Sequence, residues 1–300
     1  MSKTKSYQTK NSYIGLLYIA PWLLGFLVFQ LYPLVASLYY SFTDYNIIDQ
    51  PSLVGIANYI TLFTQDELFY KSLGITLSYV FLSVPLKLIF ALFIAMLLNF
   101  KLKFVNAYRT VYYLPSILGG SVTVAILWRF LFMEDGLLNK LLDFFHLPAV
   151  QWLSSPNIAL FTISLLTVWQ FGSSMVLFLA GLKQIPQELY EAGTVDGASK
   201  IRMFFTITVP LLTPILFFNL VLQLVNAFQD FTGPFVITNG GPMNATYLYA
   251  MKLYDEGFKF FKMGYASALS WILFMIILGF TLFIFKSAAS WTYYEDGGDF

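Results

Sequence analysis

The sequence has no cysteine, a single histidine and few charged residues. Without cysteine, the chain cannot form disulfides or thiolate metal sites. The one histidine, His146, lies near a proline in "FFHLPAV", which indicates a loop position rather than a metal ligand or a catalytic base. Charged residues are 11% of the chain, against about 25% in ordinary soluble domains. The net charge of +1 gives no basic excess for binding nucleic acid.

Hydrophobic residues take the place of the missing charges. They make up 58% of the 300 residues, and the mean hydropathy is +0.69. These values predict an all-α integral membrane protein, because a span needs about 20 apolar residues and the chain has several such runs. The first run is longer than a signal-peptide core and lacks a small-residue cleavage site, so we interpret it as a retained span. We expect one transmembrane domain over residues 1–300, with six transmembrane helices at about 14–38, 73–98, 111–132, 157–181, 210–230 and 265–286.

The placement of lysine and arginine predicts the orientation of the spans. With the N-terminus inside, the cytoplasmic segments hold Lys3, Lys5, Lys10, Lys101, Lys103, Arg109, Lys183, Lys200, Arg202 and Lys286. The outer segments hold the smaller set of Lys71, Arg129, Lys140, Lys252, Lys259 and Lys262. Both termini are therefore expected in the cytoplasm, and so is the segment 182–209 between the fourth and fifth spans.

That segment is polar although it lies between two apolar runs. Pro186 and Glu188 suit the start of a helix, and Gly197 suits its end. Ser199 can cap a second helix, so the pattern predicts a helix, a sharp turn and another helix. Small residues at the turn would let another surface approach the backbone. An amphipathic loop lying on the lipid headgroups is the alternative that these features leave open.

The stretch "YEAGTVDGASKIRMFFTITVPLLTP" resembles the EAA loop of binding-protein-dependent ABC import permeases. The family pattern is matched by Glu191, Ala192, Asp196, Gly197, Ala198, Phe204, Ile207, Pro210 and Pro214. Gly193 replaces the family's second alanine, which keeps the residue small. Other stretches, such as "LYIAPWLLGFLVFQLYPLVASLYYSFTDYN", "YRTVYYLPSILGGSVTVAILWRFLF" and "GGPMNATYLYAMKLYDEGF", extend the resemblance over nearly the whole chain and narrow it to the carbohydrate-type permeases.

The resemblance implies the permease subunit of an ATP-driven importer in a prokaryotic cell membrane, which moves a mono- to oligosaccharide by alternating access. The loop 187–214 would then be the coupling helix, and it would dock on a cytosolic ATPase through Glu191, Ala192, Gly193, Asp196, Gly197 and Ala198. The implied partners are a second homologous permease, two copies of the ATPase and an extracellular solute-binding protein. This chain would be non-catalytic and hold no cofactor, since ATP and Mg would bind the ATPase; it has no Gly-x4-Gly-Lys-Ser/Thr motif of its own. Glycerol phosphate, an anionic uronate-type oligosaccharide and an amino acid are the alternative solutes.

The fifth span carries a polar stripe that could bind a solute. Asn219, Gln223, Asn226 and Asp230 are spaced 4, 3 and 4 apart, which places them on one helix face. Polar residues at membrane depth face a wet cavity or hydrogen-bond neighbouring helices, and the spacing allows both. In related sugar permeases this part of the span lines the substrate cavity. The fourth span adds four candidates, which are Trp169, Gln170, Gly172 and Ser173.

Lys87 is an intramembrane charge whose role the sequence leaves open. It could face the cavity, pair with Asp230, or extend toward the membrane surface. Two other classes of protein are disfavoured. A membrane enzyme acting on a lipid-linked sugar would need clustered acids, and here they are scattered. An ion-coupled carrier would need inverted repeats and helices broken at the midplane, and neither is evident in the sequence.

Overall fold

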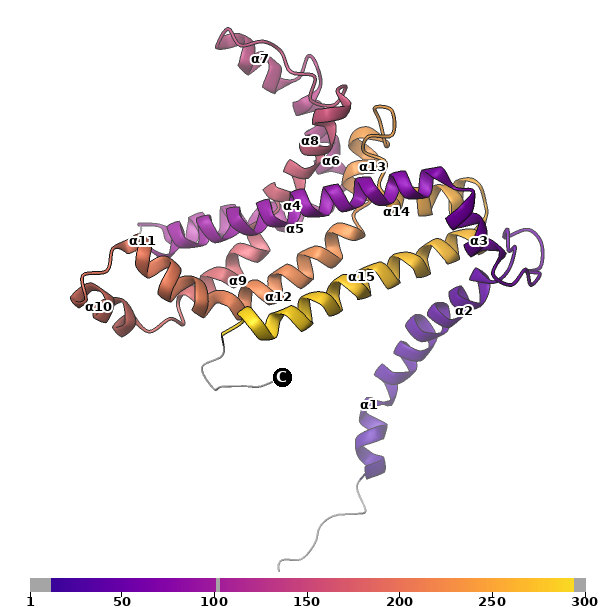
Figure 1. Ribbon diagram of the computed structural model, residues 1–300, viewed down its shortest axis with the longest axis horizontal. Coiled ribbons are helices and arrows are strands. Elements are labelled where there is room, and N and C mark those ends of the chain that lie inside the picture. The colour runs from indigo at the N-terminus through magenta and orange to yellow at the C-terminus, as the bar shows by residue number, and fades with distance from the viewer. Residues whose placement is uncertain (1–11, 101–102, 294–300) are drawn as a thin grey trace, which may run out of the picture. The chain divides into compact units, whose positions relative to one another are not determined.

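The computed structural model describes residues 12–100 and 103–293, with side chains from residue 17 onward (Figure 1). The two chain ends that we predict to be cytoplasmic lie outside the described residues. Within these residues the fold is helical, and the only strand-like pairing is an isolated antiparallel bridge between Thr43 and Leu53. The all-α class is therefore confirmed. The chain divides into two compact units, one with residues up to 65 and 254–272, the other with residues 66–253 and from 273 onward.

The first unit begins with a long apolar helix. Its parts are α1 (Ser12–Phe26), a π-helical turn (Leu27–Leu31) and α2 (Tyr32–Ser41). The loop that follows leads into the short helix α3 (Ala57–Thr64). Asn58 fastens this loop, because its Nδ2 donates to the carbonyls of Ser41 and Thr43 at 2.9 and 2.8 Å. The unit is completed by a second π-helical turn (Asp255–Lys259) and the first part of α15 (Met263–Trp291).

The second unit is built around α4 (Glu67–Asn99), which packs against α8 (Pro156–Trp169), α9 (Gly172–Leu182) and α12 (Val209–Phe228) (Figure 1). Ala91 and Ala95 are fully buried on α4, and such small residues let neighbouring helices approach closely. The other helices of this unit are α5 (Val105–Leu118), α6 (Val122–Phe132), α7 (Leu137–Phe144), α10 (Gln187–Val195), α11 (Lys200–Met203), α13 (Thr232–Thr238), most of α14 (Tyr249–Tyr254) and the rest of α15.

Two of the predicted spans are broken. The axis bends by 101° between α5 and the α6–α7 segment, and by 49° between α8 and α9. Gly119 and Gly120 interrupt the first helix, and Ser121 starts the next by accepting a hydrogen bond from the Val124 N–H at 3.3 Å. Broken helices, which are not evident in the sequence, are therefore present in two of the candidate spans.

Four helices are long and apolar enough to cross a membrane, and there are six candidate spans if each bent pair counts as one. The predicted ranges fall on these helices, and their membrane boundaries stay predictions. The helix Lys200–Phe228 is longer than its predicted span, because α11 continues through a π-helical turn (Phe204–Thr208) into α12. The second helix of the polar loop and the fifth span thus form one continuous helix.

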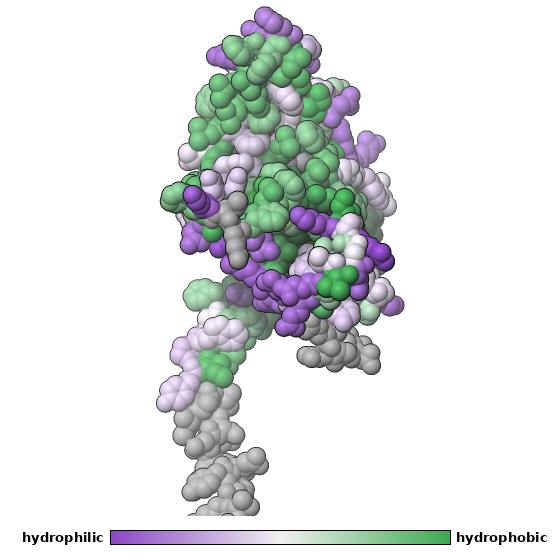
Figure 2. All heavy atoms as spheres, turned by 90° about the vertical axis from the view of Figure 1, so that its left-hand side faces the viewer, coloured by the Kyte–Doolittle hydropathy of each residue, from purple (hydrophilic) through white to green (hydrophobic). Residues whose placement is uncertain are grey.

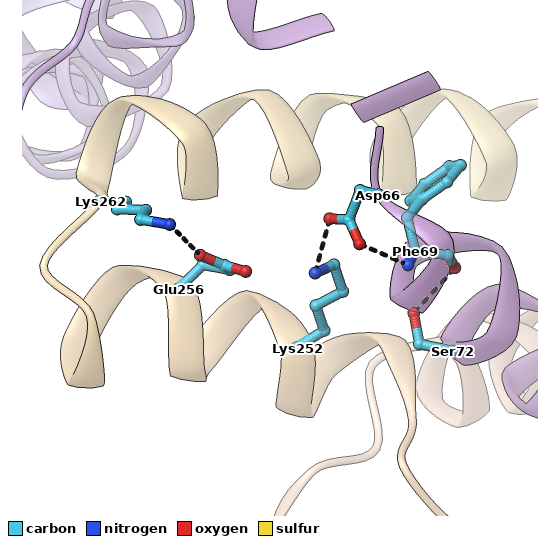
Figure 3. Close-up of polar contacts among 6 residues, drawn as sticks. All are labelled: Asp66, Phe69, Ser72, Lys252, Glu256 and Lys262. Carbon is cyan, nitrogen blue, oxygen red and sulfur yellow. Dashed lines mark hydrogen bonds and ion pairs between the residues drawn. The ribbon is translucent and has the colours of Figure 1, made fainter. Parts of the chain in front are cut away.

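A buried ion pair joins the start of α4 to α14 in the second unit (Figure 3). The Lys252 ammonium lies 2.7 Å from one carboxylate oxygen of Asp66, and the other oxygen accepts the Phe69 N–H at 2.9 Å. Asp66 therefore caps α4 and neutralises a lysine that is only 2% exposed. Figure 3 also shows an ion pair of the first unit, in which the exposed Lys262 lies 3.7 Å from the largely buried Glu256.

Candidate functional site

The second unit contains a cavity of about 360 Å³ where the broken helices meet α4 and α12. Its walls come from four places in the chain. They are the middle of α4, the α5–α6 break, the α8–α9 break, and the segment that joins α12 to α13. Because a helix break frees backbone polar groups, such breaks occur at membrane depth where they are buried in protein or line a wet cavity.

Three residues of the predicted stripe line this cavity, namely Gln223, Asn226 and Asp230. The prediction that they share one helix was wrong for Asp230, because α12 ends at Phe228 and Asp230 lies beyond it. Gln229, next to the stripe, lines it as well. No described residue forms a hydrogen bond with the side-chain amides of Gln223 or Asn226, so both can donate to and accept from a ligand. Asn219 does not line the cavity; it is fully buried, and neither polar atom of its amide has a hydrogen-bond partner among the described residues.

Gln170 and Ser173 also line the cavity, but they tie the two breaks together as well. The Gln170 Nε2 donates to the Gly119 carbonyl at 2.9 Å. The Ser116 hydroxyl donates to the Gln170 carbonyl at 3.0 Å and accepts the Ser173 N–H at 3.0 Å. Gly119 permits this contact, since a Cβ there would lie 2.2 Å from the Gln170 side chain. Gln170 therefore both lines the cavity and packs the two breaks together, and its predicted role in solute binding stays a prediction.

The two remaining candidates of the fourth span lie elsewhere. The Trp169 ring is 36% exposed and sits beside Trp128, with 6.0 Å between the ring centroids. Gly172 packs against α5, and a Cβ at this position would lie 2.6 Å from the Tyr112 carbonyl oxygen. Neither lines the cavity. Their proximity in sequence to Gln170 does not place them on the same face, because the helix bends between them.

Asp230 is held by two hydroxyl groups that the sequence analysis did not identify. The Tyr79 hydroxyl donates to the Asp230 carboxylate, and it lies 2.6 Å from the Thr167 hydroxyl oxygen. The Thr167 hydroxyl also donates to the same carboxylate oxygen at 3.4 Å. This link joins α4, α8 and the end of α12. Nothing in the sequence distinguishes Tyr79 or Thr167 from the other hydroxyl residues of their helices, such as Ser83 and Ser164.

Lys87 faces the cavity from α4 and is only 7% exposed. No described residue accepts a hydrogen bond from its ammonium or lies within ion-pair distance of it. Asp230 interacts with the Lys87 ammonium electrostatically, but at more than ion-pair distance. Of the three roles considered for Lys87, the structure thus supports the first.

The polar loop 182–209 forms the predicted helix, turn and helix. α10 ends in a Schellman motif, in which the Ala198 N–H donates to the Gly193 carbonyl at 2.9 Å and the Gly197 N–H to the Thr194 carbonyl at 3.1 Å. Gly197 takes the left-handed conformation that this motif requires, with φ of +73°. The Ser199 hydroxyl then accepts the Arg202 N–H at 3.3 Å and caps α11, as predicted.

The predicted coupling residues are spread over the exposed side of this loop. Glu191, Ala192, Asp196 and Gly197 are exposed, whereas Gly193 and Ala198 are partly buried. Gly193 faces α11, where a Cβ would lie 3.1 Å from the Met203 sulfur. Figure 2 shows hydrophilic residues gathered over the α10–α11 end of the unit. Val195 is nevertheless 87% exposed, so an apolar side chain projects from a polar surface.

Residues 69–289 match the family described as "Binding-protein-dependent transport system inner membrane component". The chain belongs to this family. The match covers α4 to α15, including the cavity and the polar loop. The permease family predicted from the EAA-like loop is therefore confirmed, and the chain is a multi-pass membrane component of a transport system.

Relatives of this permease differ in the solutes that their names give. The probable ABC transporter permease protein YesP of Bacillus subtilis is 47% identical, over 98% of this chain and 96% of YesP. The trehalose/maltose transport system permease protein MalF of Thermococcus litoralis is 34% identical, over 94% and 96%. The sn-glycerol-3-phosphate permease protein UgpA of Yersinia pestis is 35% identical, over 92% and 94%.

A solved structure shares the fold of this permease. It is a chain of a bacterial ABC transporter for the import of the acidic polysaccharide alginate, with a TM-score of 0.80. The alignment covers 92% of this chain and 95% of that chain, at 23% sequence identity. At this identity, the likeness establishes the fold of an ABC importer permease.

Proposed function

We propose that this chain is the transmembrane subunit of an ATP-driven importer that moves a saccharide by alternating access. The observation that carries the proposal is the polar cavity among the broken helices, with the amides of Gln223 and Asn226 on its wall and no described residue hydrogen-bonded to them. An amide offers a donor and an acceptor side by side, which suits the hydroxyl pairs of a sugar. The name of MalF, a relative that spans nearly the whole chain, supports the same class of solute.

The polar loop is proposed to receive mechanical work from a cytosolic ATPase. Its exposed acids, Glu191 and Asp196, can pair with bases on the ATPase, and the apolar Val195 can enter a pocket there. The continuous helix from Lys200 to Phe228 supports coupling, because a push on α11 is passed along one helix to Gln223 and Asn226. In this scheme the chain is non-catalytic, and ATP and Mg bind the ATPase.

The remaining subunits are proposed from the family. Two ATPase copies, a second homologous permease and an extracellular solute-binding protein would complete the importer in the cytoplasmic membrane, with both termini of this chain inside. The solute would leave the binding protein, enter the cavity from outside, and be released inside when the helices around it move. The amides would hold the sugar by hydrogen bonds while the hydroxyl link at Asp230 keeps α4, α8 and α12 together.

The test is reconstitution of the complete importer in proteoliposomes. We expect the loaded binding protein to stimulate ATP hydrolysis, and labelled saccharide to accumulate only when ATP is supplied on the ATPase side. An importer without the ATPase subunits should show neither activity. ATP hydrolysis that no saccharide-loaded binding protein stimulates would contradict the proposal, and uptake driven by an ion gradient would assign the chain to another class of transporter.

A further inference from the structure

Lys87 is a cation in the wall of the cavity that forms no direct ion pair with a described residue. Its side chain is 7% exposed, and no described residue pairs with its ammonium. Removing an ammonium from water is expensive unless an opposite charge or several hydrogen bonds replace the water. An ionisable residue at membrane depth therefore indicates a ligand that binds and dissociates.

The nearest acid does not serve as that partner. The carboxylate of Asp230 already accepts hydrogen bonds from Tyr79 and Thr167, which direct it toward α4 and α8. It does not come within ion-pair distance of Lys87. The other polar side chains of the wall are neutral amides and hydroxyls, such as Gln223, Asn226 and Gln170. Among the described residues that line the cavity, Lys87 is thus the charge that is open to a solute.

We propose that the solute is a saccharide with a carboxylate, a uronate, and that Lys87 binds this carboxylate while Gln223 and Asn226 bind the neighbouring hydroxyls. The inference rests on the proposed function and names the substrate class of the same cavity. Lys87 would then determine specificity for charge, and the amides would recognise the sugar in general.

The charge of the cavity favours a carboxylate over a phosphate. A phosphate monoester carries about −1.5 to −2 charges at neutral pH, whereas a carboxylate carries one. A single lysine neutralises one negative charge. No arginine lies among the described residues of the wall. The guanidinium group that commonly binds phosphate through two parallel hydrogen bonds is therefore absent there.

The experiment measures equilibrium binding to the purified complete importer in nanodiscs, without the solute-binding protein, so that only the cavity selects. The probes are galacturonate, which carries one carboxylate, its methyl ester and glycerol 3-phosphate. The proteins are the wild type, Lys87→Met, Lys87→Arg, and Lys140→Met as a control at an exposed lysine of α7. Thermal melting of each variant checks that it is folded and assembled.

We expect the wild type to bind galacturonate at least about tenfold more tightly than the ester or glycerol 3-phosphate. Lys87→Met should lose that preference and retain binding of the ester, and Lys87→Arg should keep most of it. Lys140→Met should match the wild type. Equal binding of acid and ester by the wild type, or equal losses of both in Lys87→Met, would overturn the inference and leave Lys87 a structural charge. Tightest binding of glycerol 3-phosphate would replace carboxylate by phosphate, and binding of none of the three would count against a saccharide cavity itself.

Discussion

The role of a single residue at this cavity depends on its contacts with other helices, and the sequence does not give those contacts. The spacing of Gln223, Asn226 and Asp230 predicts one helix face, and the structure places all three at the cavity, although Asp230 lies beyond the end of α12 at Phe228. Asn219 has the same spacing but lies outside the cavity, one turn away from the wall. Tyr79 and Thr167 could not be predicted, because their role follows from the contact of α4 and α8 with Asp230.

The ion pair of Lys252 and Asp66 gives a stability prediction for a single residue. In Lys252→Met, the Asp66 carboxylate loses its buried counter-charge and remains only 14% exposed. We expect a loss of about 3 kcal/mol, since breaking a buried ion pair leaves an uncompensated charge. Thermal unfolding of the purified importer should show a melting temperature that is lower by several degrees.

The matched control is Lys259→Met, which removes a lysine that is 63% exposed and 3.9 Å from Asp255. Exposed pairs contribute roughly 0–1 kcal/mol, so its melting temperature should barely change. The double variant Asp66→Asn with Lys252→Met should regain part of the loss, because no lone charge stays behind. Equal melting temperatures for Lys252→Met and Lys259→Met would show that the buried pair contributes no more than an exposed one.

At the scale of helices, the sequence predicts the polar loop well and the broken spans poorly. The loop is a local structure: capping residues and a glycine at the turn determine it, and Gly197 and Ser199 occupy their predicted places. The break at Gly119 depends on a tertiary contact, because the side chain of Gln170, distant in sequence, donates a hydrogen bond to the Gly119 carbonyl that the break frees. Two glycines in an apolar run are common in membrane helices, so the sequence pattern alone does not separate a broken helix from a straight one.

Gly197 gives a prediction about the element that joins α10 to α11. At its φ of +73°, a residue with a Cβ is strained by roughly 1–3 kcal/mol. In Gly197→Val we therefore expect the turn to change its conformation, which relieves this strain. We expect α10 to lose its position relative to α11. The ATPase should still hydrolyse ATP, while the amount of saccharide taken up per ATP falls several-fold.

Gly55→Val is a suitable control for this change. Gly55 also has a positive φ, +60°, and like Gly197 it has no atom within 4 Å of the place of a Cβ. The two substitutions therefore introduce the same kind of backbone strain into different loops. Uptake per ATP that falls equally in both variants would mean that strain in general, rather than the turn of the polar loop, is responsible.

At the scale of the whole chain, the exposed surface is consistent with a protein that lipid and other subunits surround. Large apolar side chains such as Tyr18, Phe29 and Phe283 are more than 70% exposed, which water alone would disfavour. Composition was sufficient to predict the membrane class, because it sums over all residues and does not depend on any contact. The orientation of the chain, by contrast, rests on a moderate excess of lysine and arginine on one side.

The absence of cysteine makes that orientation directly testable. Val195 and Met243 are 87% and 82% exposed, and the helix Lys200–Phe228 separates them along the chain. In intact cells, a membrane-impermeant maleimide should label Met243→Cys and not Val195→Cys, and in inside-out vesicles the pattern should reverse. Ala95→Cys, at a fully buried position, should stay unlabelled in both and so control for leakage of the reagent into the bundle. Labelling of Val195→Cys from outside would place the polar loop beyond the reach of a cytosolic ATPase, and the coupling role of Glu191 and Gly197 would fail together with the predicted orientation.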